Sequence, residues 1–289
     1  MGLYSSAEYE KGSVIYNLCK TSIFYPFLVE NGNKLSGDGG RNSMRTGTLK
    51  QILLITDGCS NQGEDPIAMA TLAREQGVTV NVIGVMKQDV IDDQGLKEIE
   101  GIALAGGGVS QVVYSQQLSQ TVQMVTRKAM TQTLQGVVNK ELQQILGGTK
   151  KMEDLPPEKR GEIMEVVDEL GETVELDVLI LVDTSASMTH KLPTVKEALL
   201  DLSLSLNARS GSNRFSVFAF PGKKVEVEKL LDWTPNLESL TTIFSKLTTG
   251  GITPTGPAIK EAISIFQQKK RSLRSMLSRD DEQFFEESI

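Results

Sequence analysis

The sequence has very few of the residues on which several common kinds of protein chemistry depend. His190 is its only histidine, and Cys19 and Cys59 are its only cysteines. A four-ligand zinc site made of cysteine and histidine is excluded, because the chain has too few of these ligands. Two cysteines also exclude a disulfide-rich scaffold and favour a reducing compartment. A single histidine leaves little room for a serine–histidine–aspartate triad.

Long apolar runs and an excess of basic residues are missing as well. No apolar run approaches the length of a membrane-spanning helix, and the start of the chain lacks the basic and apolar regions of a signal peptide. The formal net charge is −7, from 30 basic and 37 acidic residues. This balance argues against binding nucleic acid or anionic lipid through bulk charge. We therefore expect a cytoplasmic protein with neither nucleic acid nor a membrane among its partners.

Residues 1–43 show neither helical nor strand periodicity and are expected to be an irregular N-terminal extension. A second methionine, Met44, stands just before the first convincing strand, and Gly-Asp-Gly-Gly-Arg lies shortly upstream of it. Purine-rich codons for these residues would resemble a ribosome-binding site, which leads to the hypothesis that translation starts at Met44. A flexible native extension explains the same sequence equally well, and mass spectrometry of the native N-terminus separates the two.

Beyond Met44 the chain alternates between short apolar runs and amphipathic segments. Continuous apolar runs such as QILLIT (51–56) and LDVLILV (176–182) are typical of strands that are buried on both faces of a sheet. The pair Asp65–Pro66 has the signature of a helix N-terminus. Strands separated by helices predict an α/β fold, with a doubly wound, mostly parallel sheet covered by helices on both faces.

Each half of the chain supplies three predicted strands. Strands are expected at 51–56, 78–85, 110–115, 176–182, 214–220 and 224–230, the last two as a hairpin. Helices are expected at 66–76, 96–105, 118–146, 157–170, 194–208, 237–247 and 255–268, with Gly171 ending the fourth. Neither half has enough strands for a complete sheet, so we expect the two halves to share one.

Three short segments carry oxygen-bearing side chains where ligands bind in such folds. DTSAS (183–187) follows the strand 176–182, GGITPTG (250–256) opens the last helix, and TDG (56–58) ends the strand 51–56. In an open α/β sheet these segments lie at the carboxyl ends of strands or in the loops beside them. Carboxylates and hydroxyls are hard ligands, which suit magnesium, manganese or calcium and not zinc or copper.

Together the three segments resemble the von Willebrand factor A domain and its metal-ion-dependent adhesion site. The resemblance implies a Rossmann-like six-stranded sheet and a site for Mg²⁺, with Mn²⁺ or Ca²⁺ as alternatives. It assigns five metal ligands, which are Asp183, Ser185, Ser187, Thr253 and Asp57. Thr255 is the second choice in the loop that holds Thr253.

The order of the segments departs from that of the family. The family has Asp-x-Ser-x-Ser first and Thr-Asp-Gly later, whereas here Asp57 lies far upstream of Asp183. Residues 44–135 resemble the family's C-terminal half and residues 176–268 its N-terminal half, which predicts a circular permutation. The resemblance then implies that strands 51–56 and 176–182 are neighbours at the topological switch point, where Asp57 and Asp183 would meet.

The segments outside the two halves are an acidic, helical connector at 136–175 and a charged tail at 269–289. The connector would join the original ends of the family's fold. Domain swapping, in which each half completes the site of another copy, is the alternative to permutation within one chain. We therefore expect a monomer or a domain-swapped dimer, similar in layout to small A-domain proteins of spore-forming bacteria.

The expected function follows from the chemistry of a hard cation. An ion held by hydroxyls, carboxylates and water can exchange one water for a carboxylate. The sequence therefore predicts a metal-dependent module that captures an Asp or Glu side chain of a partner protein, without enzymatic activity. An accessory subunit of an ATPase, kinase or chelatase complex is one alternative. A magnesium-dependent hydrolase is less favoured, because the chain has no P-loop, no G-x-S-x-G elbow and no obvious general base.

Each segment taken alone also has a plain structural interpretation. The segment 183–187 is typical of a helix N-terminal cap, and Thr253 and Thr255 suit the start of the last helix. Asp57 before Gly58 is typical of an ordinary turn. The metal site is favoured by the presence of all three segments, each in its expected structural setting.

Overall fold

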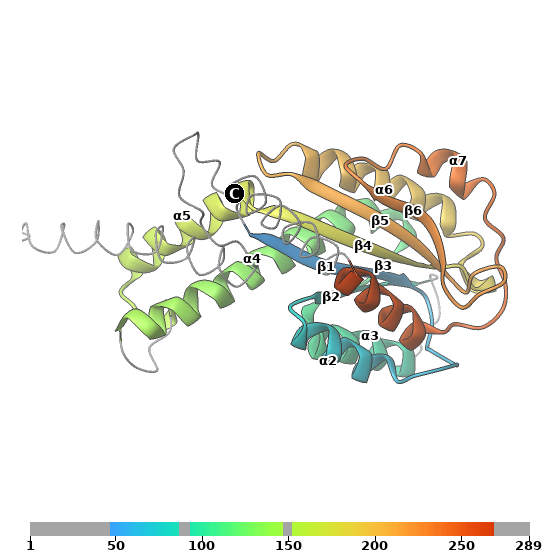
Figure 1. Cartoon of the computed structure of the whole chain (residues 1–289), viewed down its shortest axis with the longest axis horizontal. Helices are drawn as coiled ribbons and strands as arrows, with labels where there is room; N and C mark the ends of the chain where they lie inside the picture. The colour runs from blue at the N-terminus through green and yellow to red at the C-terminus, as the bar shows by residue number, and fades with distance from the viewer. Residues whose placement is uncertain (1–46, 87–92, 147–151, 269–289) are drawn as a thin grey trace, which may run out of the picture.

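The computed structural model describes residues 47–86, 93–146 and 152–268. Within these residues, six strands form one sheet with helices on both faces (Figure 1). The expectations for the extension 1–43, for a start at Met44 and for the tail 269–289 lie outside the described residues.

The sheet has the strand order β3-β2-β1-β4-β5-β6. Its strands are β1 (Thr48–Thr56), β2 (Thr79–Met86), β3 (Gly107–Tyr114), β4 (Glu175–Asp183), β5 (Asn213–Phe220) and β6 (Glu228–Thr234). All neighbouring strands pair in parallel except β5 and β6, which pair antiparallel. The predicted mostly parallel sheet is confirmed, and β1 and β4 are neighbours at its centre, although they come from different halves of the chain.

The central strands are buried on both faces because their side chains point alternately into two hydrophobic clusters. In β1, Leu53 and Ile55 belong to one cluster, whereas Ile52 and Leu54 belong to the other. The same alternation in β4 explains why both strands are continuous apolar runs.

Each face of the sheet has its own set of helices (Figure 1). One face packs against α2 (Pro66–Glu75), α3 (Asp93–Ala105) and the helix at 255–268. The other face packs against α4 (Leu118–Leu146), α6 (Leu192–Asn207) and α7 (Leu240–Phe244). Three short 3₁₀ turns complete the described structure, η1 (Ser115–Gln117), η2 (Met152–Asp154) and η3 (Ala186–Met188).

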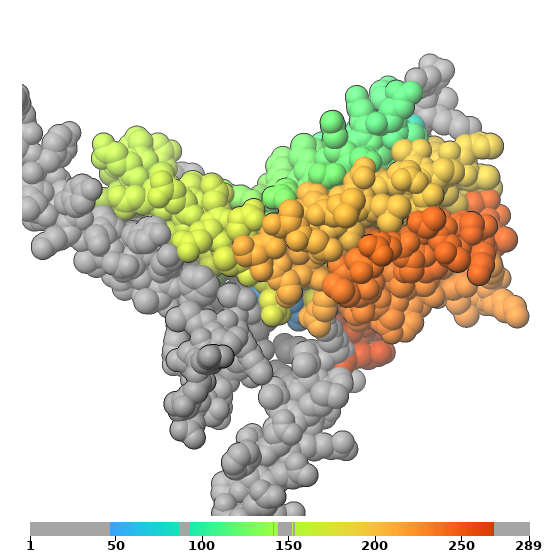
Figure 2. Space-filling view, turned by 90° about the horizontal axis from the view of Figure 1, so that it is seen from above, coloured from blue at the N-terminus to red at the C-terminus, as the bar shows by residue number. Residues whose placement is uncertain are grey.

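The predicted connector corresponds to the end of α4 together with α5 (Pro157–Thr173). Figure 1 shows these helices reaching past the end of the sheet at which the strands begin, and in Figure 2 the yellow-green residues of this region project from the rest of the described residues. The side chain of Asn139 on α4 accepts the N–H of Met152 at 2.9 Å, and apolar residues of both helices share one cluster with the sheet. None of the described helices is long and apolar enough to cross a lipid bilayer.

Several predicted boundaries are wrong, among them the end of α5, the start of α7 and the start of β6. Helix α5 does not end at Gly171 but continues to Thr173, and the side chain of Arg209 donates hydrogen bonds to the carbonyls of Gly171 and Val174 at this end. Helix α7 is five residues long instead of eleven. The N–H of Leu237, the expected start of this helix, donates to the hydroxyl of Ser203 instead.

The second strand of the predicted hairpin also begins later than expected. Strand β6 starts at Glu228 and not at residue 224. The N–H of Gly222 donates to the carbonyl of Glu226, and the N–H of Lys223 donates to the carboxylate of Glu228. These bonds close residues 222–228 into a loop, so that pairing with β5 can begin only beyond it.

Candidate metal centre

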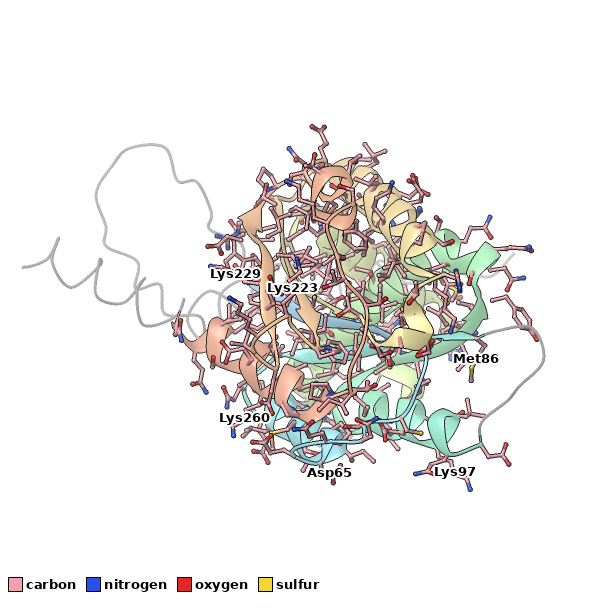
Figure 3. The ribbon with its side chains drawn as sticks, turned by 90° about the vertical axis from the view of Figure 1, so that its right-hand side faces the viewer. Asp65, Met86, Lys97, Lys223, Lys229 and Lys260 are labelled. Atoms are coloured by element: carbon pink, nitrogen blue, oxygen red, sulfur yellow. The ribbon has the colours of Figure 1, made fainter. Side chains whose placement is uncertain are left out.

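The predicted site segments meet where β1 and β4 end. The parallel register pairs Ile55 with Val182, so the loops that follow the two strands emerge side by side. The chain then passes from β1 to α2 on one face and from β4 to α6 on the other. This divergence creates the crevice in which doubly wound sheets bind ligands. Figure 3 views the molecule from this side.

Asp183, the last residue of β4, is fully buried. Its two carboxylate oxygens accept the N–H of Ser185 and the hydroxyl of Thr56, each at 2.7 Å. Burial raises the pKa of Asp183 above its ordinary value, although the hydrogen bonds from Ser185 and Thr56 act in the opposite direction. The site therefore has a desolvated carboxyl group that accepts hydrogen bonds from neutral donors.

Four of the five predicted ligands form one continuous chain of hydrogen bonds. Beyond Asp183, the hydroxyls of Ser185 and Ser187 lie 3.1 Å apart. The hydroxyl of Ser187 then donates to Oδ1 of Asp57 at 2.7 Å. The side chain of Asp57 is only 2% exposed, whereas Ser187 is exposed. The structure thus brings together side chains from both halves of the chain.

The loop after β4 takes its shape from bonds made by alternate residues. The N–H of Thr184 donates to the carbonyl of Phe220, and its hydroxyl donates to the carbonyl of Pro221 at the end of β5. The buried side chain of Met188 anchors the following 3₁₀ turn, and its N–H donates to the carbonyl of Ser185. Because Thr184 is held against β5, Asp183 and Ser185 on either side of it are available to the crevice.

Thr253 is held beside the loop after β1 through its backbone. Asn61 bonds this backbone twice, since its side chain accepts the N–H of Thr253 at 2.8 Å and its own N–H donates to the carbonyl of Thr253 at 3.2 Å. Within the described residues, the hydrogen bonds of Thr253 are those of its backbone, so its hydroxyl is not joined to the chain of four. The hydroxyl of Thr255 is buried and has no hydrogen-bond partner in the same part of the structure.

The loop after β1 and the start of the helix at 255–268 touch through their backbones. A Cβ atom on Gly256 would lie 1.8 Å from the carbonyl oxygen of Glu64. Any larger residue at position 256 would therefore push the two segments apart, which explains why glycine stands there. The loop is also tied to α3, because Glu98 accepts the N–H of Ser60 at 2.7 Å. Burial raises the pKa of Glu98, and this hydrogen bond lowers it less.

Lys191, which sequence reasoning did not single out, lies in the same crevice. It directly precedes α6 and is only 6% exposed. Its ammonium group donates to the carbonyl of Val85 at the end of β2, at 2.8 Å, and forms a short ion pair with Oδ2 of Asp57. The sequence held one signal for Lys191, which is its position directly before a helix. A helix N-terminus disfavours a positive charge, so a lysine there is expected to have a negatively charged partner.

Models of the von Willebrand factor type A domain match the chain twice, over residues 178–278 and over residues 36–128. The chain belongs to the von Willebrand factor type A domain family. The first matched segment contains Asp183 and Thr253, and the second contains Asp57. Both parts of the candidate site therefore lie in segments that match the family's models.

This von Willebrand factor A protein is similar to two further bacterial proteins. It is 70% identical over 244 residues to the "Uncharacterized protein YabS" of Bacillus subtilis (strain 168), a match that covers 84% of this chain and 99% of the relative. It is 44% identical to a protein of Alicyclobacillus acidocaldarius subsp. acidocaldarius DSM 446 whose crystal structure has been solved. That structure matches with a TM-score of 0.72, over 78% of this chain and 97% of the other, and supports the fold described above.

The donor set of this A domain fits a hard divalent cation. Within the described ranges, no group of three or more His, Cys, Asp or Glu side chains could hold a metal ion. A metal in the crevice would therefore depend on two carboxylates supplemented by hydroxyls and water, which is a composition that magnesium accepts. The buried carboxyl of Asp183 accepts hydrogen bonds from neutral donors and has no positive partner among them, and the buried hydroxyl of Thr255 has no hydrogen-bond partner in the described structure.

Proposed function

We propose that the protein is a divalent-metal-dependent protein-binding module that captures an Asp or Glu side chain of a partner. The observation that supports this most strongly is the hydrogen-bonded chain from Asp183 to Asp57 at the switch point of the sheet. Von Willebrand factor A domains are in general metal-dependent protein-interaction modules, so the family supports the same function.

In this proposal Asp183, Ser185, Ser187, Thr253 and Asp57 hold the ion, which is Mg²⁺, or Mn²⁺ or Ca²⁺ in its place. The bound ion supplies a coordination position that a carboxylate of the partner can fill. The side chains of this chain set the access to that position. Asp183 and Ser185 are buried, whereas Ser187 is exposed and marks the side on which the partner approaches.

The rim of the crevice offers further contacts for a partner. The hydroxyls of Thr189 and Thr249 lie 2.7 Å apart at the surface, and Ile252 is 44% exposed in the loop that contains Thr253. A partner would thus meet hydroxyls and one apolar side chain beside the acidic group that it inserts.

The proposal includes no catalytic step. Asp183 and Asp57 act as ligands, and the ammonium of Lys191 is already paired with Asp57. His190 is exposed on the turn before α6 and has no assigned role in the site.

Capture of partners from a native lysate tests this function directly. The immobilised full chain is compared in Mg²⁺ and in EDTA with Asp183→Asn, which removes a charged ligand but keeps the shape of the side chain. Asp201→Asn, at an exposed position of α6, is the matched control. We expect proteins that the wild type and the control retain only in Mg²⁺ and that Asp183→Asn does not retain. Identical capture by all three proteins, or capture that survives EDTA, would refute the proposal.

A further inference from the structure

The position of Lys191 is electrostatically unfavourable for two reasons, which are its burial and its place at the start of a helix. Lysine is rarely buried unless it is paired, and the start of α6 adds the partial positive charge of a helix N-terminus. The ion pair with Asp57 and the hydrogen bond to the carbonyl of Val85 offset these costs. A positive charge has thus been placed inside the crevice that the proposed function assigns to a cation.

The charges of the crevice can be counted from the described side chains. Asp183 and Asp57 contribute two negative charges and Lys191 contributes one positive charge, which leaves one net negative charge. A divalent ion added to this set gives one net positive charge. Without the ammonium group of Lys191, the same ion would leave the set neutral. Because these side chains are largely buried, water screens the difference poorly.

We propose that Lys191 sets the preference of this site for an anionic partner group. The inference rests on the metal-dependent function proposed above. Lys191 lowers the affinity of the empty site for a cation, because it repels the ion and neutralises Asp57. Once a cation is bound, Lys191 leaves a positive charge that favours a carboxylate over a neutral ligand such as water or an amide. Lys191 therefore lowers the affinity of the site for the metal and raises the affinity of the metal-loaded site for the acidic partner.

A purely structural role for Lys191 predicts a different outcome. If the ammonium group only held Asp57 in place, its removal would weaken the binding of the cation and of the carboxylate together. Asp57 has a second anchor, however, because its Oδ1 accepts the hydroxyl of Ser187. The carboxylate therefore keeps one fixed oxygen without Lys191, and the loss of charge is expected to dominate. Opposite changes in the two affinities distinguish the two roles.

The test uses the full chain with Mn²⁺ as the cation and glutarate as the carboxylate probe. Electron paramagnetic resonance of free Mn²⁺ gives the affinity for the ion. Water-proton relaxation of the loaded protein gives the affinity for glutarate, because a bound carboxylate displaces water from the ion. The variants are Lys191→Met and Lys191→Gln, the latter keeping a hydrogen-bond donor. Lys196→Met is the matched control, since it removes a positive charge from the same helix outside the site.

We expect both Lys191 variants to bind Mn²⁺ about tenfold more tightly or better and to bind glutarate several-fold more weakly, while Lys196→Met matches the wild type. Unchanged affinities, or a fall in both, in variants with a native circular dichroism spectrum would overturn the role of Lys191 alone. No uptake of Mn²⁺ by the wild type would overturn the proposed function, and this inference with it.

Discussion

The carboxyl group of Asp183 shows how a single residue is prepared for a cation. Its burial raises its pKa, and the donors from Ser185 and Thr56 lower the pKa less. The folded state therefore favours the protonated form of Asp183 more than the unfolded state does. The part of the stability that depends on Asp183 is present at low pH and is lost as the pH rises through the raised pKa, unless a cation compensates the charge.

As the pH is lowered, the affinity for the metal is therefore expected to begin falling at a higher pH than it would with an aspartate of ordinary pKa. A cation binds the deprotonated carboxylate, so protons compete with it as the pH falls towards the raised pKa of Asp183. The measurement is a series of Mn²⁺ titrations from neutral pH downwards, on protein whose circular dichroism shows that it is folded at each pH. An affinity that stays constant until the ordinary titration range of aspartate would contradict the effect of burial.

Thr56 should support metal binding although it is not a predicted ligand. Its hydroxyl donates to Oδ2 of Asp183 at 2.7 Å and so orients the carboxylate. Thr56→Val keeps the shape and removes the donor, and we expect the affinity for Mn²⁺ to fall by roughly 10–100-fold. Thr71→Val, which removes an exposed hydroxyl on α2, serves as the control. Equal Mn²⁺ affinity in calorimetric titrations of both variants would show that the hydrogen bond has no part in the site.

At the scale of elements, the candidate site depends on loops from distant parts of the sequence that fix one another. The loop after β1 holds the backbone of Thr253 through Asn61 and is itself tied to α3 through Glu98. The loop after β4 is held by β5 through Thr184. The loops that carry the candidate ligands are thus held by elements other than their own, which explains how hydroxyls on loops can keep a defined geometry.

Removal of the Asn61 side chain should loosen the loop that contains Thr253. Asn61→Ala removes the acceptor for the N–H of Thr253, so we expect faster hydrogen exchange of that amide and several-fold weaker Mn²⁺ binding. Gln62→Ala, at an exposed neighbouring position, is the control. Mass spectrometry of peptides covering residues 250–257 measures the exchange. An unchanged exchange rate in Asn61→Ala would show that other contacts hold this loop.

The elements that the sequence predicts well are those whose signal is local. The apolar runs of β1 and β4 and the cap at Asp65 depend on neighbours in the chain, and the N–H of Ile67 does donate to Asp65 as expected. The C-terminal end of α5 and the start of α7 depend on Arg209 and Ser203, which lie far from them in sequence. Such boundaries cannot be derived from local periodicity.

The candidate site divides in the same way. Asp183, Ser185, Ser187 and Asp57 stand in recognisable segments, and the order of the strands brings the segments together. The pairing of Lys191 could not be derived, because it depends on how the start of α6 meets the ends of β1 and β2 across the sheet. Thr56 lies in the predicted segment TDG, but its hydrogen bond to Asp183 could not be derived for a similar reason, since Asp183 belongs to the other half of the chain.

At the scale of the whole molecule, both halves of one chain form one sheet, and β1 pairs with β4 along nearly its full length. A single chain therefore contains all the residues of the candidate site. Circular permutation of the family's order stays a prediction, as does the choice between a monomer and a domain-swapped dimer.

If one chain completes its own site, metal affinity should not change when the protein is diluted.

Calorimetric titration of Mn²⁺ into the full chain tests the central claim most directly, with Asp183→Asn as the comparison at several protein concentrations. We expect the wild type to take up one ion per chain at every concentration and Asp183→Asn to lose that uptake. An absence of uptake by the folded wild type, or equal uptake by Asp183→Asn, would contradict the assignment of this crevice as a metal site.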